Sequence, residues 1–233
     1  MDDKEKKGVS SKFILPDLAI LDPLLTTNLP ANITASTGID AMVHAIEAFT
    51  SINSNNNPVS KMLSIEALKL LGSSIKTAVF DGHNINARSN MLLGSMLAGK
   101  AFANSPVAAV HALAYPIGGL FNISHGLSNS LVLTSVMKFN SKNEETKKNY
   151  AHLAPYVFKN LDNSKNDEFL CNNFIDGLER LCKELNLPYR LRDLEIPEEA
   201  CKLMASEAMK QTRLLVNNPR KIEESDAFNI YKS

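Results

Sequence analysis

Residues 107–117 read Val-Ala-Ala-Val-His-Ala-Leu-Ala-Tyr-Pro-Ile, and the polar side chains in this run, His111 and Tyr115, are four positions apart. Positions i and i+4 lie on the same face of an α-helix, so the two side chains would share one stripe. A helix that is apolar nearly all round is expected in a protein interior. The stretch therefore predicts a buried helix whose two polar side chains need partners.

On both sides of this stretch, apolar residues recur at spacings of three and four, as in amphipathic helices. The predicted helices cover 39–49, 61–79, 87–104, 107–117, 127–139, 169–184 and 198–215. Turns are expected at 54–58, at 81–84, at Pro116 with Gly118-Gly119, and over the polar stretch 141–149. The pattern predicts an all-α fold, a helical bundle.

One short segment favours a strand instead. Residues 13–21 read Phe-Ile-Leu-Pro-Asp-Leu-Ala-Ile-Leu and are followed by Asp22-Pro23, which is typical of a buried parallel strand. A single parallel strand has no ladder partner within this chain. We therefore expect its sheet to come from another polypeptide or from the upstream part of a larger protein.

The composition excludes several classes of partner. The 25 Lys and Arg residues balance the 25 Asp and Glu residues, so no net charge attracts nucleic acid or an anionic membrane. No apolar run is long enough to span a bilayer, and the charged residues 1–7 are not followed by the apolar segment of a secretory signal. Cys171, Cys182 and Cys201 are widely spaced, which favours free thiols in a reducing compartment. We expect a cytoplasmic protein.

A second polar stripe occurs on the predicted helix 39–49, where Asp40, His44 and Glu47 lie at positions i, i+4 and i+7. A buried carboxylate or imidazole without a partner is costly, so the stripe indicates either facing polar groups or a metal ion. The simpler alternative is that Asp40 and His44 bond each other or lie on a solvated edge.

Two further histidines flank the predicted corner between helices. Ser124 is a candidate N-cap, so His125 would begin the next helix. Taken singly, His111 could be a core histidine bonded to a carbonyl and His125 a surface residue. Taken with Asp40 and His44, they offer one carboxylate and three neutral imidazoles, a ligand set suited to Fe(II) or Zn(II). Such an ion would polarise an alcohol or carbonyl oxygen.

These residues, in this order, resemble the C-terminal domain of the iron-containing alcohol dehydrogenase family. The motifs that carry the resemblance are Leu15-Pro16-Asp17, Leu21-Asp22-Pro23, Thr37-Gly38-Ile39-Asp40-Ala41-Met42-Val43-His44-Ala45-Ile46-Glu47-Ala48-Phe49, Ala98-Gly99-Lys100-Ala101-Phe102-Ala103-Asn104, His111-Ala112-Leu113-Ala114-Tyr115-Pro116-Ile117-Gly118-Gly119, Ser124-His125-Gly126 and Asn218-Pro219-Arg220. The resemblance implies a helical bundle of the dehydroquinate synthase-like type. Residues 1–28 would be the remnant of a Rossmann-like domain, including its last strand, and residues 29–233 the helical metal-binding domain.

The resemblance also implies roles for single residues. It places the four metal ligands of the family at Asp40, His44, His111 and His125. Phe102 falls on an aromatic residue beside the substrate pocket. Tyr115 stands where many alcohol-oxidising members have a further histidine that is assigned to proton relay. A phenol is a poorer proton acceptor than an imidazole at neutral pH, but it can still exchange hydrogen bonds with substrate, so Tyr115 is a catalytic candidate.

The implied function is oxidation of a small alcohol to an aldehyde or ketone with NAD(P), in which this chain supplies the metal and substrate half. The metal would be Fe(II), with Zn(II) as the alternative. No Gly-rich phosphate loop occurs in the sequence, so no residue is predicted to bind the nucleotide. A complementing nucleotide-binding domain or a second copy of the chain is therefore an expected partner. Two alternatives stay open: a truncated, non-catalytic metal-binding module, and a glycerol dehydrogenase-like relative.

Overall fold

A computed structural model describes residues 11–233, and over this range the chain is helical without any strand. The α-helices are α1 (Ala31–Thr50), α2 (Pro58–Phe80), α3 (Ile85–Asn104), α4 (Ala109–Phe121), α5 (His125–Asn140), α6 (Glu144–Val157), α7 (Asp167–Glu184), α8 (Ala200–Met209), α9 (Thr212–Leu215) and α10 (Glu224–Lys232). Short 3-10 turns are η1 (Lys12–Ile14), η2 (Pro23–Thr26) and η3 (Leu191–Leu194). The prediction of a helical bundle is confirmed for the described residues.

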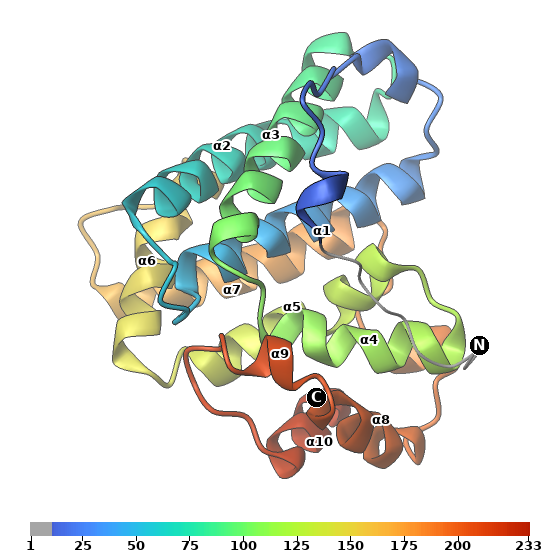
Figure 1. Cartoon of the computed structure of the whole chain (residues 1–233), viewed down its shortest axis with the longest axis vertical. Coiled ribbons are helices and arrows are strands. Elements are labelled where there is room, and N and C mark those ends of the chain that lie inside the picture. The colour runs from blue at the N-terminus through green and yellow to red at the C-terminus, as the bar shows by residue number, and fades with distance from the viewer. Residues whose placement is uncertain (1–10) are drawn as a thin grey trace.

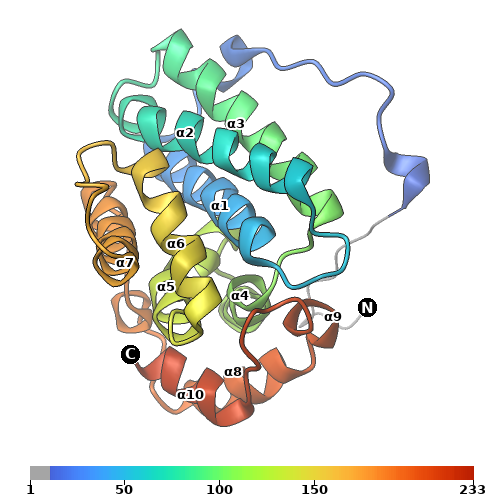
Figure 2. The ribbon, with the colours of Figure 1, turned by 90° about the vertical axis from the view of Figure 1, so that its left-hand side faces the viewer.

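Helix α1 runs through the middle of the molecule (Figures 1 and 2). Helices α2 and α3 pack on one side of it, and α5 and α6 pack on the other. Helix α4 lies against α5, and α8 to α10 close the far end against α4 and α5. Within residues 11–233, no helix is long and apolar enough to cross a membrane.

The central position of α1 follows from its sequence. Ile39, Met42, Val43 and Ile46 are almost completely buried, so this helix has apolar contacts on more than one face. Gly38 lets side chains of α2 and α3 pack on the backbone of α1, because a Cβ there would lie 2.7 Å from Met91 Cε and 2.8 Å from Ile75 Cδ1. The polar stripe predicted from the sequence is thereby brought into the protein interior.

The predicted break at Pro116 is wrong. Helix α4 continues through Pro116 and Gly118-Gly119 to Phe121, and it ends at Asn122 in the left-handed conformation with φ of 54°. A proline inside a helix removes one backbone hydrogen bond and costs about 3 kcal/mol. Burial on both sides outweighs that cost here, since Leu113 and Ile117 are completely buried.

The predicted turn over 141–149 is also too long. Helix α6 already begins at Glu144, because the Asn143 side chain accepts the backbone N–H of Thr146 as an N-cap. Two acidic residues in its first turn favour the helix through its dipole. Residues 141–143 form the turn, whereas the polar residues 144–149 belong to the first turns of a helix.

The carboxyl-terminal helices differ from the prediction as well. The single helix expected over 198–215 is divided into α8 and α9 at Lys210 and Gln211. Helix α10 was not predicted, although its apolar residues Ala227, Ile230 and Tyr231 are buried against the bundle. Nine residues are too few for the apolar period to stand out in the sequence.

The predicted strand over 13–21 does not form. Its first residues lie in η1, and residues 15–22 have no regular secondary structure. A strand needs a neighbour for its backbone donors and acceptors, and the described part of the chain offers none. Residues 1–10 of the predicted remnant 1–28, including the charged cluster 1–7, lie outside the described residues.

Candidate metal centre

Four side chains with metal-ligand chemistry meet where α1, α4 and α5 come together. Asp40 and His44 come from α1, His111 from α4, and His125 from the first position of α5. One potential ligand atom from each lies within 4.8 Å of the others. The structure thus brings together the four residues that the sequence analysis singled out, although they lie on three separate helices.

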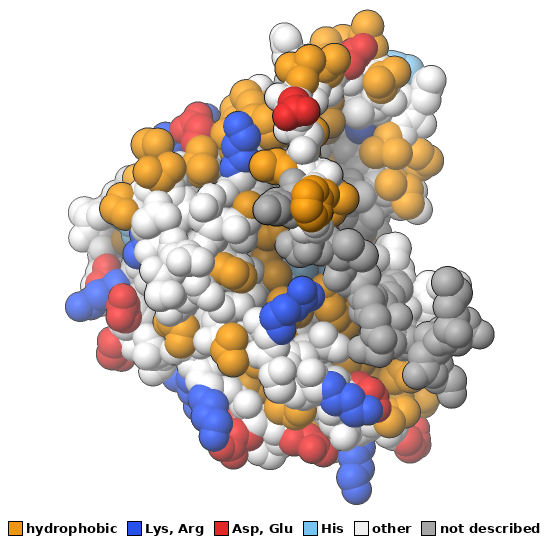
Figure 3. Space-filling model, viewed as in Figure 1, with side chains coloured by type: hydrophobic (Ala, Val, Ile, Leu, Met, Phe, Trp, Pro, Cys, Tyr) orange, Lys and Arg blue, Asp and Glu red, His pale blue; other side chains and the backbone are white. Residues whose placement is uncertain are grey.

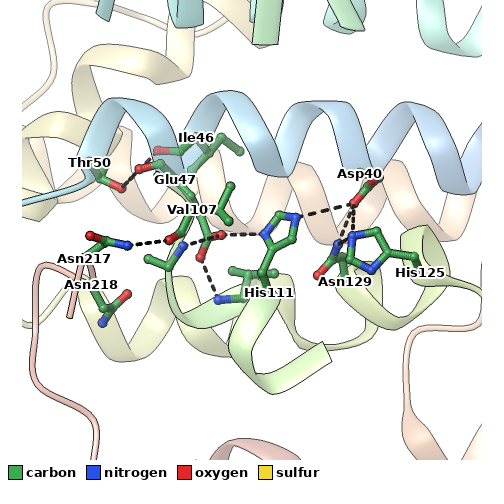
Figure 4. Close-up of polar contacts among 12 residues, drawn as sticks. Asp40, Ile46, Glu47, Thr50, Val107, His111, His125, Asn129, Asn217 and Asn218 are labelled. Carbon is green, nitrogen blue, oxygen red and sulfur yellow. Dashed lines mark hydrogen bonds and ion pairs between the residues drawn. The ribbon is translucent and has the colours of Figure 1, made fainter. Parts of the chain in front are cut away.

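Glu47 fixes the orientation of the His111 ring (Figure 4). Its Oε2 accepts from His111 Nδ1 at 2.7 Å and from the backbone N–H of Ala108 at 3.0 Å. Its Oε1 accepts from the backbone N–H of Val110 at 2.6 Å. An ionised carboxylate can only accept, so Nδ1 carries the proton and Nε2 of the neutral ring keeps its lone pair.

His111 Nε2 has no hydrogen-bond partner, although it is buried. Asp40 Oδ1 lies 3.9 Å from this nitrogen, beyond hydrogen-bond distance. A buried acceptor without a partner costs about 1–3 kcal/mol, and native proteins contain few of them. A cation between Asp40 and the imidazoles would remove this cost.

His44 lies in a stack of rings. It packs on Phe102 with a centroid distance of 4.7 Å and on His111 with a centroid distance of 4.6 Å. Burial, followed by the neighbouring His111, lowers the pKa of His44 to about 4. The ring is therefore neutral near pH 7, which is the form that binds metals. Phe102, the predicted pocket residue, is in direct contact with a candidate ligand.

Asp40 and His125 face each other across the α1–α5 contact. Asp40 Oδ1 lies 3.7 Å from His125 Nε2, and it accepts a hydrogen bond from Asn129 Nδ2 on α5 at 2.5 Å. Asp40 thus finds its donor on another helix rather than in His44, which the simpler sequence interpretation had paired with it. Asn129 was not noticed in the sequence.

Gly126 makes this contact possible. A Cβ at this position would lie 2.5 Å from the backbone oxygen of Ser36 and 3.3 Å from Asp40 Cβ, so no larger residue fits there. The first turn of α5 therefore packs directly on the backbone of α1, and His125 is held beside Asp40. Tyr115 borders the same corner, with its ring centroid 6.0 Å from that of His125.

A groove of about 570 Å³ occurs elsewhere, between α5, α7, α8 and α10. None of the four cluster residues lines it. The candidate centre is therefore distinguished by its set of donor atoms and by its buried, unpartnered nitrogen, and not by a deep cavity.

Residues 34–233 match the Fe-containing alcohol dehydrogenase family, C-terminal domain, a range that includes all four cluster residues. This chain belongs to the Fe-containing alcohol dehydrogenase family. Over 233 aligned positions it is 39% identical to long-chain-alcohol dehydrogenase 1 of Geobacillus thermodenitrificans, which covers 98% of this chain and 56% of the relative. It is 36% identical over 218 positions to 1,3-propanediol dehydrogenase of Citrobacter freundii, covering 94% and 55%.

Solved structures of the family have the same fold. The chain superposes on a 1,3-propanediol oxidoreductase with a TM-score of 0.85 at 34% identity, covering 91% of this chain and 54% of the other. It superposes on an archaeal halo-thermophilic alcohol dehydrogenase from a Red Sea brine pool with a TM-score of 0.91 at 28% identity, covering 99% and 58%. The chain thus spans just over half the length of these family members, and the resemblance found in the sequence is confirmed.

Proposed function

We propose that this chain is the metal- and substrate-binding half of an iron-containing, NAD(P)-dependent alcohol dehydrogenase acting on a small alcohol or aldehyde. The observation that carries the proposal is the buried, unpartnered Nε2 of His111, close to three further ligand-type side chains. The relatives named above are alcohol and 1,3-propanediol dehydrogenases, which supports the same reaction class.

The donor set fits the metal. Three imidazole nitrogens and one carboxylate oxygen suit Fe(II), with Zn(II) as the alternative, better than they suit Mg²⁺ or Ca²⁺, which prefer oxygen ligands. Asp40, His44, His111 and His125 would hold the ion. Once bound, the metal supplies Lewis-acid polarisation of the substrate oxygen.

The other residues of the site would prepare this chemistry. Glu47 keeps the His111 lone pair directed away from its own carboxylate, because it holds the proton on Nδ1. Phe102 offers an apolar surface beside His44, suited to the carbon chain of a substrate. Tyr115 stands near His125, where its hydroxyl group could exchange a hydrogen bond with a substrate oxygen.

The nucleotide is proposed to come from a second unit. We infer that residues 1–28 belong to the nucleotide-binding side and that residues 29–233 form the helical metal-binding domain. The chain contains no Gly-rich phosphate loop, and it spans just over half of its relatives. A complementing nucleotide-binding domain, or a homo-oligomer, would complete the enzyme.

The test is metal analysis after anaerobic purification, combined with an assay of NAD-linked alcohol oxidation. We expect one equivalent of metal in the unmodified protein and its loss in the His111→Ala variant. His83→Ala is the matched control, since His83 is an exposed histidine outside the cluster, and it should keep the metal. Unchanged stoichiometry in the His111→Ala variant would contradict the ligand assignment.

Turnover separates the proposal from its alternatives. Metal without turnover by this chain alone is expected from the missing phosphate loop. Activity should appear when a nucleotide-binding half is added. If no activity appears although the metal is bound, the non-catalytic metal-binding module is favoured. Preference for glycerol over simple alcohols would favour the glycerol dehydrogenase-like alternative.

A further inference from the structure

Asn129 is a buried amide that touches two of the candidate ligands. It lies on α5, one turn after His125, and none of its surface is exposed. Its Nδ2 donates to Asp40 Oδ1 at 2.5 Å and lies 3.2 Å from His125 Nε2 (Figure 4). One side chain thus joins a ligand on α1 with a ligand on α5.

The orientation of this amide follows from its neighbour. The Asp40 carboxylate can only accept, so the NH₂ group must face it, and an amide oxygen in the same place would be repelled. One N–H then donates to Asp40 Oδ1, and the same NH₂ group lies 3.2 Å from Nε2 of the His125 ring. Asn129 thus contacts both candidate ligands, and a carboxylate oxygen that accepts one hydrogen bond still has a lone pair for a cation.

The oxygen of the same amide is left without a hydrogen-bond partner in a buried place. Such a group costs about 1–3 kcal/mol, which offsets the stability gained from the hydrogen bond to Asp40. Folding stability by itself therefore does not account for an asparagine here. The bonds to the two candidate ligands are what distinguish it from an apolar residue.

We propose that Asn129 is a positioning residue of the metal centre. It holds the Asp40 carboxylate by a hydrogen bond and lies against the His125 ring, so that both side chains keep their places beside a shared cation. Without it, Asp40 would lose the one hydrogen-bond donor to its carboxylate that is found among the described residues. This inference rests on the proposed function, since it needs a cluster that binds metal. Losing a residue that orients a ligand typically weakens metal binding by about 10–100-fold.

Asn140 provides a matched control on the same helix. It is also a buried asparagine of α5, and its Nδ2 donates to Asn218 Oδ1, away from the cluster. Replacing either residue by leucine removes one buried amide from α5. The two variants therefore differ in one respect: the amide removed at position 129 contacts candidate metal ligands, and the amide removed at position 140 does not.

The experiment measures Co(II) affinity by competition with a chelator, the visible spectrum of the Co(II) form, and the melting temperature of the metal-free protein. For Asn129→Leu we expect about 10–100-fold weaker Co(II) binding and a changed spectrum. The melting temperature should change little, because the lost bond to Asp40 is offset by removal of the unpartnered amide oxygen. For Asn140→Leu we expect a lower melting temperature with unchanged affinity and spectrum. If the leucine variant does not fold, Asn129→Ser serves instead, because its shorter side chain does not reach Asp40.

Each result decides the question. Unchanged affinity and spectrum in the Asn129 variant, with a wild-type protein that binds one Co(II), would overturn this inference and leave the proposed function standing. Equal losses of affinity in the Asn129 and Asn140 variants would show a general effect of destabilising α5, and this would also overturn it. A wild-type protein that binds no metal would overturn the proposed function and this inference with it.

Discussion

Two regions of the molecule differ in which side chains they bury. One is the corner where α1, α4 and α5 meet, and the other is the segment 11–29. At the corner, polar side chains are buried and hydrogen-bonded, as Glu47 is to His111. In the segment, large apolar side chains are between 63% and 87% exposed, namely those of Phe13, Ile14, Leu15, Leu18, Ile20, Leu24 and Leu25. Figure 3 shows hydrophobic side chains along the path that this segment follows in Figure 1.

The difference indicates which region is held in place by contacts within the described residues and which is not. At the corner, the hydrogen bonds of Glu47 and of Asp40 hold the candidate ligands in place from within the chain. Contiguous exposed apolar side chains favour a surface covered by further polypeptide, either from another chain or from the upstream part of a larger protein. The candidate centre should therefore keep its geometry in the isolated chain, whereas the segment should respond to whatever partner is present.

The largest effect is expected at Glu47. The Glu47→Ala substitution leaves His111 Nδ1 and two backbone N–H groups without their acceptor in a buried place. We expect the free energy of unfolding, measured with urea, to fall by about 3–5 kcal/mol, and metal binding to be lost. Glu184→Ala is the control, since its ion pair with Lys76 is exposed and should contribute less than about 1 kcal/mol.

A small decrease in the free energy of unfolding for Glu47→Ala, similar to that for Glu184→Ala, would show that this carboxylate does not hold the corner together. The corner would then not be the more firmly held of the two regions.

The second effect concerns thiol reactivity. Burial raises the pKa of Cys171 to about 11 and that of Cys182 to about 12, whereas a Leu18→Cys thiol in the exposed segment should keep an ordinary pKa near 8.5. Since the thiolate reacts, alkylation at pH 8 should be at least about 100-fold slower at Cys171. Its rate should keep rising with pH up to about pH 11, while that of the Leu18→Cys thiol levels off above about pH 8.5.

Mass spectrometry of the modified peptides measures both rates in one sample. Equal rates at Cys171 and at the Leu18→Cys thiol in the native protein would contradict the assigned burial of one or the exposure of the other.

The smallest effect is expected in the segment itself. Replacing Leu15, Leu18 and Ile20 together by serine should change the free energy of unfolding by less than about 0.5 kcal/mol per site, because these side chains bury little surface. Light scattering should show less self-association than in the unmodified protein. The control Met42→Ala, in the core of α1, should cost about 2–5 kcal/mol.

A large destabilisation by the three serines would mean that the segment packs on the bundle in solution, which would remove the contrast between the two regions.

The parts of the site that the sequence predicted share a local signature. Asp40 and His44 are four positions apart on one helix, and His111 stood out as a polar residue in an apolar run. Both signals can be recognised from the helical period of the sequence alone. His125 was singled out as the residue after a candidate N-cap, but its place beside Asp40 depends on the close packing at Gly126. That packing involves residues about 90 positions apart and has no local signature.

What the sequence missed depends on contacts between distant residues. Glu47 was seen on the polar stripe, but its bonds to the start of α4 join residues more than 60 positions apart. Asn129 resembles any other polar residue of a helix until its neighbour on α1 is known. The apolar composition of residues 13–21 led to the wrong prediction of a buried strand. Composition does not say whether a segment is covered by other residues.

The contact at Gly126 also bears on how movement reaches the candidate site. Because the first turn of α5 rests on the main chain of α1, Asp40 and His125 stand on two helices that touch backbone to backbone. A residue larger than glycine at position 126 would push α5 away from Ser36, and that displacement would carry His125 away from Asp40.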